Sequence, residues 1–359
     1  MIAQKHQLAS STWDPSDVEP AVDLLRSGRC SMGPKVAEFE RRFADYIGTR
    51  YAVMVNSGSS ANLLMVAAYT LRYGKGTVIV PAVGWATCYS PFQQYGWRLV
   101  FVDVDDSLCI DPYEAWEAKG RIQSHPTYDP DPEVHGQCII LAVNLLGNAC
   151  EFARLPRVEL LEDNCEALGA EYLGQKTGSF GVMSSHSFYF SHHLCTMEGG
   201  MITTDDEYFY HMLLSLRSHG WTRHLPTPNR LNATVAPFEF IYPGYNVRPT
   251  DLQGQLGLTQ LDKLDAMLAI RRDNAARCPL KLPREVGKSS WFAFATPKTA
   301  ALDACCETRP VVAGNFTRSA SIRYYDYEIQ GDLPVANEIH DHWCYIGNHS
   351  TPIDWSLLD

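Results

Sequence analysis

The sequence has no long hydrophobic run and no cluster of basic residues. Of its 359 residues, 20% are charged, and the formal net charge is −11. Surfaces that bind nucleic acid carry clustered Lys and Arg, so this acidic balance argues against a nucleic-acid partner. No stretch approaches the roughly 18 apolar residues of a membrane-spanning helix, and the N-terminal residues show no apolar signal core. We therefore expect a globular enzyme in the cytoplasm with no membrane partner.

Paired metal-ligand spacings are also absent. The eleven cysteines are an odd number, and neither Cys-x-Cys nor Cys-x-x-Cys occurs. Zinc centres and disulfide frameworks both use paired cysteines, so we expect reduced thiols and no metal site. The cysteines lie at positions 30, 88, 109, 138, 150, 165, 195, 278, 305, 306 and 344.

Lysine is missing from a long internal stretch. None occurs between residues 177 and 262, because the nine lysines lie at 5, 35, 75, 119, 176, 263, 281, 288 and 298. An amine nucleophile from within this stretch is thereby excluded. The stretch contains the segment from Ser187 to Gly200, which runs Ser-Phe-Tyr-Phe-Ser-His-His-Leu-Cys-Thr-Met-Glu-Gly-Gly.

Apolar, β-rich runs alternate with helix-like stretches along the first half of the chain. They occur at 51–55, 77–80, 98–102, 138–143 and 158–161, with a helix expected from residue 62 to 73. Such alternation is typical of a mostly parallel sheet with helices on both faces. Polar Asp163 follows the last of these runs. Sheets of this class bind ligands at the carboxyl ends of their strands, so this is a candidate site.

The sequence of the second half of the chain predicts a long helix followed by a domain boundary. The helix is expected over 251–273, with Leu252, Leu256, Leu258, Leu261 and Leu264 on its core face. Two prolines and a glycine between 278 and 290 predict a connector. We therefore predict a large domain over 1–277, including an N-terminal arm, a connector over 278–290 and a small C-terminal domain over 291–359.

The segment from Ser187 to Gly200 resembles the active-site segment of the DegT/DnrJ/EryC1/StrS family, the pyridoxal-phosphate sugar aminotransferases. In that family Ser-Phe precedes the lysine that binds the cofactor covalently, and Glu-Gly-Gly follows it. The spacings from Ser187 and to Glu198 both place His192 at the lysine's position, rather than the adjacent His193. The resemblance implies the α/β fold of type I aspartate aminotransferases, with a large, mostly parallel-sheet domain that binds the cofactor and a smaller C-terminal α+β domain.

Histidine at this position changes the chemistry that the resemblance implies. Imidazole cannot form the covalent bond that lysine makes with the cofactor, but it moves protons near neutral pH. The resemblance therefore implies pyridoxal 5'-phosphate or pyridoxamine 5'-phosphate that is not covalently anchored. His192 would be the catalytic acid/base residue.

Three further residues match family positions around the cofactor ring. Asp163 matches the aspartate that pairs with the pyridine nitrogen, and Glu166 stands where the family often has glutamine near the ring oxygen. Trp85 matches an aromatic residue that stacks on the ring. Taken alone, an aspartate at a strand end is more often a helix cap, and a tryptophan after a strand is more often a packing residue.

The cofactor phosphate also has matching residues. Ser57, Gly58 and Ser59 enter a helix and match the phosphate-binding turn, to which Ser187 adds a hydroxyl group. A serine-rich helix cap without a ligand explains the same three residues when they are read alone. Asn246 matches an asparagine that reaches the phosphate from the neighbouring subunit. The resemblance thus implies a homodimer with shared active sites.

Three functions remain open. The lysine-to-histidine branch of the family makes 3,6-dideoxy sugars. The resemblance of this sequence to that branch implies a 3-dehydratase acting on a nucleotide-linked 4-keto-6-deoxyhexose. A GDP-linked sugar is favoured, with glutamate as amino donor. An iron–sulfur branch uses a Cys-x-Cys pair, which this sequence lacks, so we expect no cluster. The alternatives are a nucleotide-sugar aminotransferase with His192 as proton shuttle, and a non-catalytic binding or regulatory protein. His219 is a possible substrate contact, and Arg248 is expected to be structural.

Overall fold

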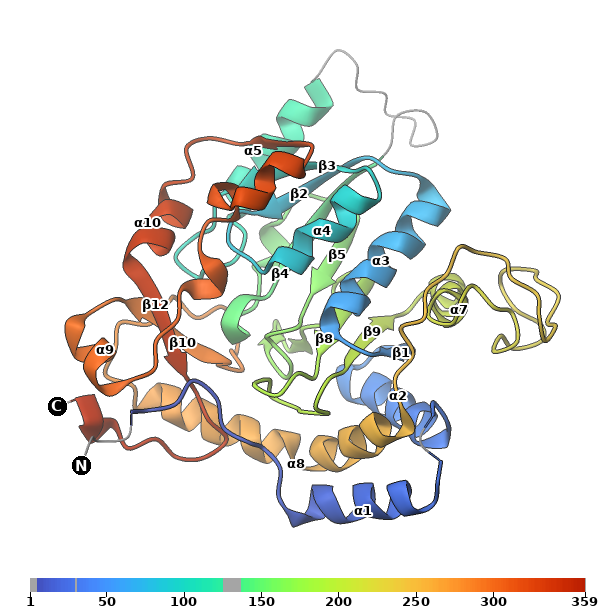
Figure 1. Cartoon of the computed structure of the whole chain (residues 1–359). Coiled ribbons are helices and arrows are strands. Elements are labelled where there is room, and N and C mark those ends of the chain that lie inside the picture. The colour runs from blue at the N-terminus through green and yellow to red at the C-terminus, as the bar shows by residue number, and fades with distance from the viewer. Residues whose placement is uncertain (1–4, 30, 125–136, 359) are drawn as a thin grey trace.

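The computed structural model describes residues 5–29, 31–124 and 137–358, so the predicted thiol Cys30 lies outside the described residues. Its main sheet has eight strands, in the order β1-β9-β8-β5-β4-β2-β3-β11 (Figure 1). These are β1 (Tyr51–Val55), β2 (Thr77–Pro81), β3 (Arg98–Val102), β4 (Cys138–Val143), β5 (Leu160–Asp163), β8 (Met183–Ser187), β9 (Gly200–Thr204) and β11 (Tyr327–Ile329). All described pairings from β8 to β11 are parallel, and β9 pairs antiparallel with both neighbours. The expected mostly parallel sheet is confirmed.

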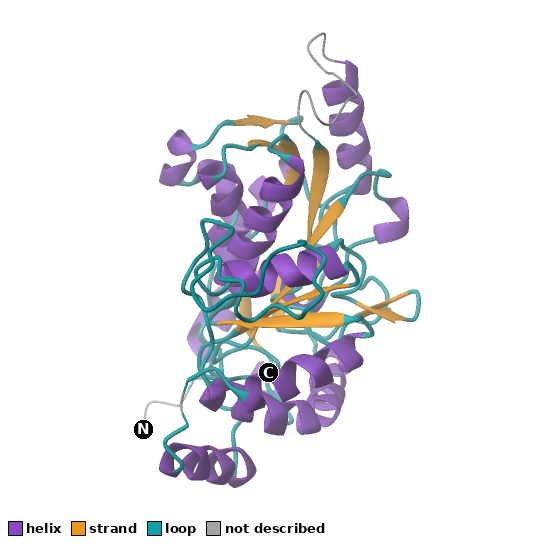
Figure 2. Cartoon of the chain, turned by 90° about the vertical axis from the view of Figure 1, so that its right-hand side faces the viewer, coloured by secondary structure: helices purple, strands orange, loops and turns teal. Residues whose placement is uncertain are grey.

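Helices lie on both sides of this sheet (Figure 2). They are α1 (Pro15–Arg26), α2 (Pro34–Ile47), α3 (Gly58–Tyr73), α4 (Ala86–Gln94), α5 (Pro112–Ser124), α7 (Glu207–Leu216), α8 (Asp251–Ala276), α9 (Ala300–Cys305) and α10 (Pro334–His342). Two short pairs complete the strands: β6 (Glu171–Tyr172) with β7 (Gln175–Lys176), and β10 (Ala293–Pro297) with β12 (Trp343–Gly347). None of the described helices is long and apolar enough to cross a membrane.

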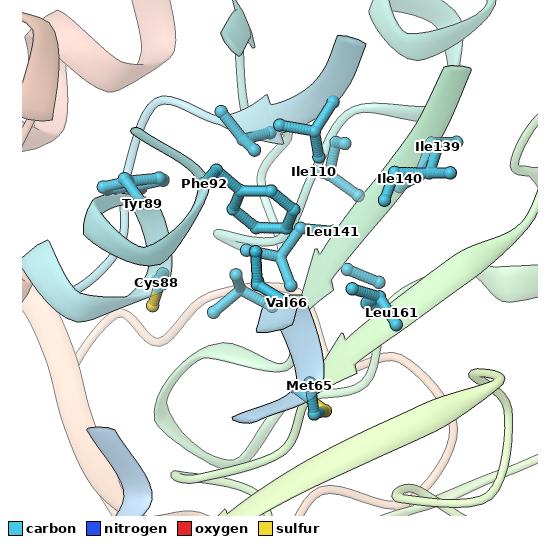
Figure 3. Close-up of a cluster of buried hydrophobic side chains, with 14 of the residues drawn as sticks. Met65, Val66, Cys88, Tyr89, Phe92, Ile110, Ile139, Ile140, Leu141 and Leu161 are labelled. Atoms are coloured by element: carbon cyan, nitrogen blue, oxygen red, sulfur yellow. The ribbon is translucent and has the colours of Figure 1, made fainter. Parts of the chain in front are cut away.

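Strand β1 shows why both faces of the sheet are covered. Its residues alternate, so that Val53 and Val55 pack into the cluster formed with α3, whereas Ala52 and Met54 pack into the cluster formed with α2 and α8. A strand buried on both faces needs apolar residues at every position, which explains its continuous apolar sequence. The larger cluster contains the side chains drawn in Figure 3.

Two element boundaries differ from the sequence prediction. Helix α3 begins at Gly58, four residues before the expected start, because the Ser57 side chain caps it by accepting a hydrogen bond from the backbone N–H of Ser60. Strand β5 begins at Leu160 rather than 158, since the chain at 156–158 is still in a turn. Asp163 is therefore the last residue of the strand and not the residue after it.

The structure confirms the long helix that the spacing of its leucines predicted, and this helix is α8. Leu256, Leu258, Leu261 and Leu264 are buried, and Leu252 is half-buried. The helix runs three residues beyond the expected end. After it the chain forms the β10–β12 pair, and then β11 adds a strand to the main sheet beside β3. The division at 278–290 stays a prediction, with the qualification that residues 327–329 belong to the main sheet.

Candidate functional site

A cavity of about 560 Å³ opens where β1, β2, β4, β5 and β8 end. Segments that follow these strands line one side, and residues 292, 309, 310, 312, 313 and 345 line the other. The cavity thus lies between the main sheet and the C-terminal part of the chain. It brings together eight of the predicted site residues, namely Ser57, Gly58, Ser59, Trp85, Asp163, Glu166, Ser187 and His192.

Asp163 ends β5 with a buried carboxylate that accepts three hydrogen bonds. Its Oδ2 accepts from Asn62 Nδ2 at 2.7 Å and from the Cys88 thiol at 3.1 Å. Its Oδ1 accepts from the backbone N–H of Cys165 at 3.0 Å. Because no described cation pairs with this carboxylate, neutral donors alone hold it at the cavity wall.

The turn between β1 and α3 is shaped by close backbone approaches. A Cβ atom added to Gly58 would lie 2.6 Å from Cβ of Ser187, and one added to Gly200 would lie 2.3 Å from the carbonyl oxygen of Ser57. Glycine at both positions lets β8 and β9 lie directly against the turn. The Ser59 hydroxyl is 2.8 Å from the Thr87 hydroxyl, which joins this turn to the start of α4. Hydroxyl groups and the first N–H groups of α3 therefore converge on one end of the cavity, an arrangement that suits an anion.

The two adjacent histidines, His192 and His193, have different surroundings in the structure. His193 is buried, and its Nε2 donates to the carbonyl oxygen of Ser290 at 3.1 Å. His192 lines the cavity, and its ring packs edge-on against Phe292 with a centroid distance of 5.1 Å. Nδ1 of His192 is buried and has no hydrogen-bond partner among the described residues. Burial, and then the guanidinium of Arg271, lowers the pKa of His192 to about 3.

Glu166 is a second carboxyl group on the cavity wall. Its Oε2 accepts a hydrogen bond from the backbone N–H of Leu146 at 3.0 Å, and none of the described salt bridges includes it. Burial raises the pKa of Glu166 to about 7, with the Asp163 carboxylate adding to the rise. Its charge therefore changes near neutral pH, unlike that of His192.

Trp85 lies at the mouth of the cavity. Its side chain is 56% exposed, which excludes the alternative that it is a core packing residue. Tyr189, Phe190 and Met197, which flank His192 in the sequence, are also large apolar side chains that are exposed. Of these three, Tyr189 lines the cavity as well. An aromatic ring at the open end can cover a planar ligand held below it.

Three predicted residues lie elsewhere. Asn246 and His219 are not among the cavity-lining residues of the described chain, and they belong to a segment that extends from α7 to α8 (Figure 1, yellow). His219 has a φ of 66°, and its backbone N–H donates to Tyr245. Arg248 holds this segment, since its Nε donates to Asn246 Oδ1 at 3.1 Å and its side chain reaches Ser218. The structural role expected of Arg248 fits these contacts, and the roles of Asn246 and His219 stay predictions.

Sequence reasoning missed several cavity residues. Asn62 and Cys88 come from the N-terminal parts of α3 and α4, and Phe292, Arg309 and Tyr345 come from the C-terminal part. A polar residue near the start of a helix that follows a strand is a usable signal, because such helix starts meet at the ligand-binding edge of a parallel sheet. Arg309 is the only Lys or Arg among the described residues that line the cavity.

Comparisons with known proteins agree with this architecture. The model of the DegT/DnrJ/EryC1/StrS aminotransferase family matches residues 13–293. The GDP-4-keto-6-deoxy-D-mannose 3-dehydratase of Yersinia pseudotuberculosis is 40% identical over 381 residues, covering 95% of this chain and 93% of that relative.

Two solved structures extend the similarity to the fold. The E. coli GDP-4-keto-6-deoxy-D-mannose-3-dehydratase with bound hydrated PLP (pyridoxal phosphate) has a TM-score of 0.88 at 38% identity, covering 99% of this chain and 97% of that one. A GDP-4-keto-6-deoxymannose-3-dehydratase with glutamate trapped on its PLP has a TM-score of 0.87 at 38% identity, covering 98% of each chain. The fold is therefore the pyridoxal-phosphate-dependent, aspartate aminotransferase-like fold, and the chain belongs to the DegT/DnrJ/EryC1/StrS aminotransferase family.

Proposed function

We propose that this protein is a pyridoxal-phosphate-dependent 3-dehydratase that removes the C3 oxygen of GDP-4-keto-6-deoxymannose, with glutamate as amino donor. The observation that carries the proposal is His192, a neutral imidazole that faces the cavity where the family has its covalent lysine. No lysine lines the cavity within the described residues. The substrate and the donor follow from the names of full-length relatives at 38–40% identity.

The cavity fits pyridoxal or pyridoxamine phosphate. Ser57, Ser59 and Ser187 with the N-terminus of α3 would hold the phosphate, in a turn that a Cβ at Gly58 would fill. Asp163 would pair with the ring nitrogen and Trp85 would cover the ring. When bound, the cofactor supplies an amine for the 4-keto group and a conjugated ring that accepts electrons.

His192 moves the proton in this proposal. His192 lines the cavity, and its imidazole is neutral at neutral pH because burial lowers the pKa to about 3. Once the ring accepts a proton from the bound cofactor, burial makes the imidazolium unfavourable, so it would release that proton readily to the leaving C3 hydroxyl group. A single residue thereby serves as base and then as acid.

We further propose that the cofactor is held without a covalent bond and that no iron–sulfur cluster takes part. Support for the first point is the cavity lining, which offers serine, aspartate and tryptophan side chains but no amine. Support for the second is the arrangement of thiols. The ten cysteines in the described residues are free, and among those residues no three His, Cys, Asp or Glu side chains lie close enough together to hold a metal.

A homodimer with shared active sites is also part of the proposal. Asn246 and His219 lie outside the cavity of their own chain, on the segment that extends beyond α7 (Figure 1). Phe238 and Phe240 on the same segment are 80% and 51% exposed. Exposed aromatic residues of this size are typical of a surface covered by a partner. Light scattering after size-exclusion chromatography would show a mass twice that of the chain, whereas a monomer that is fully active would contradict it.

The decisive assay is incubation with pyridoxal phosphate, glutamate and GDP-4-keto-6-deoxymannose, followed by mass spectrometry of the nucleotide sugar. We expect a product that is lighter by one oxygen atom, together with equal amounts of 2-oxoglutarate and ammonia. An amino sugar would contradict dehydration and identify an aminotransferase. Absence of any conversion, with the cofactor bound, would favour a binding protein.

Replacing Trp85 with alanine is expected to weaken pyridoxal phosphate binding about tenfold, because an unanchored ring depends on stacking. Equilibrium dialysis of the protein with the cofactor measures this directly. Trp116→Ala is the matched control, since Trp116 is a half-exposed tryptophan on α5 outside the cavity. Equal affinities of the Trp85 variant and the wild type would remove Trp85 from the cofactor site.

The pH dependence should report Glu166 rather than His192. Burial raises the pKa of Glu166 to about 7, so the side chain is neutral below this pH and an anion above it. The nucleotide sugar is itself an anion, so kcat/KM is expected to fall as the pH rises through about 7. In Glu166→Gln this fall should disappear, whereas Glu117→Gln on α5 should keep it. A Glu166→Gln profile that still falls near pH 7 would assign the transition to another group.

A further inference from the structure

The two oxygens of the Asp163 carboxylate accept different numbers of hydrogen bonds. Asn62 Nδ2 and the Cys88 thiol both donate to Oδ2, from helices that belong to different strand–helix units. A carboxylate oxygen offers two lone pairs, so these two donors saturate Oδ2. Among the described residues, Oδ1 accepts one hydrogen bond, from the backbone N–H of Cys165, which leaves one of its lone pairs.

The Cys88 thiol is a proton donor in this arrangement. Its side chain is buried on α4, next to the core residues Tyr89 and Phe92 (Figure 3). Burial, and then the Asp163 carboxylate, raises the pKa of the Cys88 thiol well above its usual range. The thiol therefore keeps its proton, and its S–H group is available to the carboxylate at 3.1 Å.

Asn62 is retained at a cost to stability. Its Nδ2 donates to Asp163, but its buried Oδ1 has no hydrogen-bond partner in the part of the chain that the structure describes. An unpaired buried carbonyl oxygen is destabilising, and an apolar side chain at this position of α3 would avoid it. The donor contact to Asp163 is the one polar interaction that this amide makes among the described residues. Its presence thus indicates a role in the cavity rather than in folding.

We propose that Asn62 and Cys88 are positioning residues that occupy Oδ2 of Asp163, so that Oδ1 is the oxygen presented to the cofactor's ring nitrogen. The inference rests on the proposed function, in which Asp163 pairs with that nitrogen. Each donor also stabilises the ionised carboxylate, which keeps the shared proton on the nitrogen. Removing a donor should move the proton toward Asp163 and weaken the ring as an electron acceptor.

The test uses the full-length protein loaded with pyridoxal phosphate that carries 15N in its ring. In Cys88→Ala we expect the 15N NMR signal to move toward that of an unprotonated ring nitrogen and kcat to fall about fivefold. In Asn62→Ala the shift should be larger and kcat should fall about 20-fold, because an amide donates more strongly to a carboxylate than a thiol does. Cys88→Ser keeps a donor and should restore the wild-type signal.

Cys109→Ala is the matched control, since Cys109 is another buried thiol of the same core cluster but has no contact with Asp163. Its 15N signal should equal that of the wild type. If the signals of Cys88→Ala and Asn62→Ala also equal that of the wild type, the positioning role is wrong, even when kcat falls through lost packing. A wild-type protein that binds no labelled cofactor would instead contradict the proposed function itself.

Discussion

His192→Lys is expected to give a protein in which borohydride links pyridoxal phosphate covalently to residue 192, while dehydration falls on the order of 10³-fold. Lysine restores the amine that the family uses, and its four-carbon chain starts from a position that already lines the cavity. The fall in rate follows because the acid/base imidazole is removed. Peptide mass spectrometry after reduction locates the modification, and the mass assay for the lighter sugar measures the rate.

Two comparisons make this result specific. His342→Lys adds a lysine at an exposed position of α10, outside the cavity, and should gain no cofactor at that residue. His192→Asn removes the imidazole without adding an amine, so dehydration should be lost and borohydride should fix nothing. Fixation of the cofactor to any lysine of the wild-type protein would contradict an unanchored cofactor. Undiminished dehydration by His192→Asn would remove the histidine from the reaction.

Much of the sheet could be predicted from the sequence, because strands buried on both faces must be apolar at every position. The bounds of β1, β3 and β4 matched their apolar runs without any shift. Strand β8 was missed since its sequence is Met-Ser-Ser-His-Ser, although all five residues are buried. Its polar side chains are satisfied inside the fold, as where the Ser184 hydroxyl donates to Oε2 of Glu162 at 2.8 Å and His186 contacts the hydroxyl of Thr203. Hydropathy cannot reveal a strand whose polar groups pair only in the tertiary structure.

The candidate site also contains some residues that the sequence alone predicts and others that only the folded structure reveals. Asp163, Ser187 and His192 lie in or beside contiguous motifs, so their positions could be compared with a family pattern. Asn62 and Cys88 could not, because an asparagine or cysteine in a helix has no meaning until the helices pack against the end of β5. The same holds for residues of the C-terminal part that reach the cavity across more than a hundred positions of sequence. The sequence alone thus predicts residues to which the proposed function gives the chemistry, whereas packing is needed to find the residues that contact them.

Asp163→Asn is expected to reduce kcat on the order of 10³-fold while the protein still binds pyridoxal phosphate, because a neutral amide cannot keep the ring nitrogen protonated. The hydrogen bonds fix how the new amide must turn. Asn62 and Cys88 both donate at the Oδ2 position, so the amide oxygen must lie there. The amide nitrogen then takes the Oδ1 position, where it opposes the N–H of Cys165 and donates toward the ring nitrogen. The ring would be held in its unprotonated form.

The spectrum of the bound cofactor distinguishes an effect of Asp163→Asn on the ring from a general loss of structure. The absorbance and 15N signal of bound pyridoxal phosphate should match an unprotonated ring, and the mass assay should show little oxygen loss. Asp103→Asn is the matched control, since Asp103 is also a buried carboxylate near a strand end, but it accepts from backbone N–H groups at the start of α10 outside the cavity. That variant should lose stability and keep a protonated ring. If Asp163→Asn retained a protonated ring nitrogen and near-normal turnover, electron withdrawal would have to come from another group, and Glu166 would be the next carboxyl group to replace.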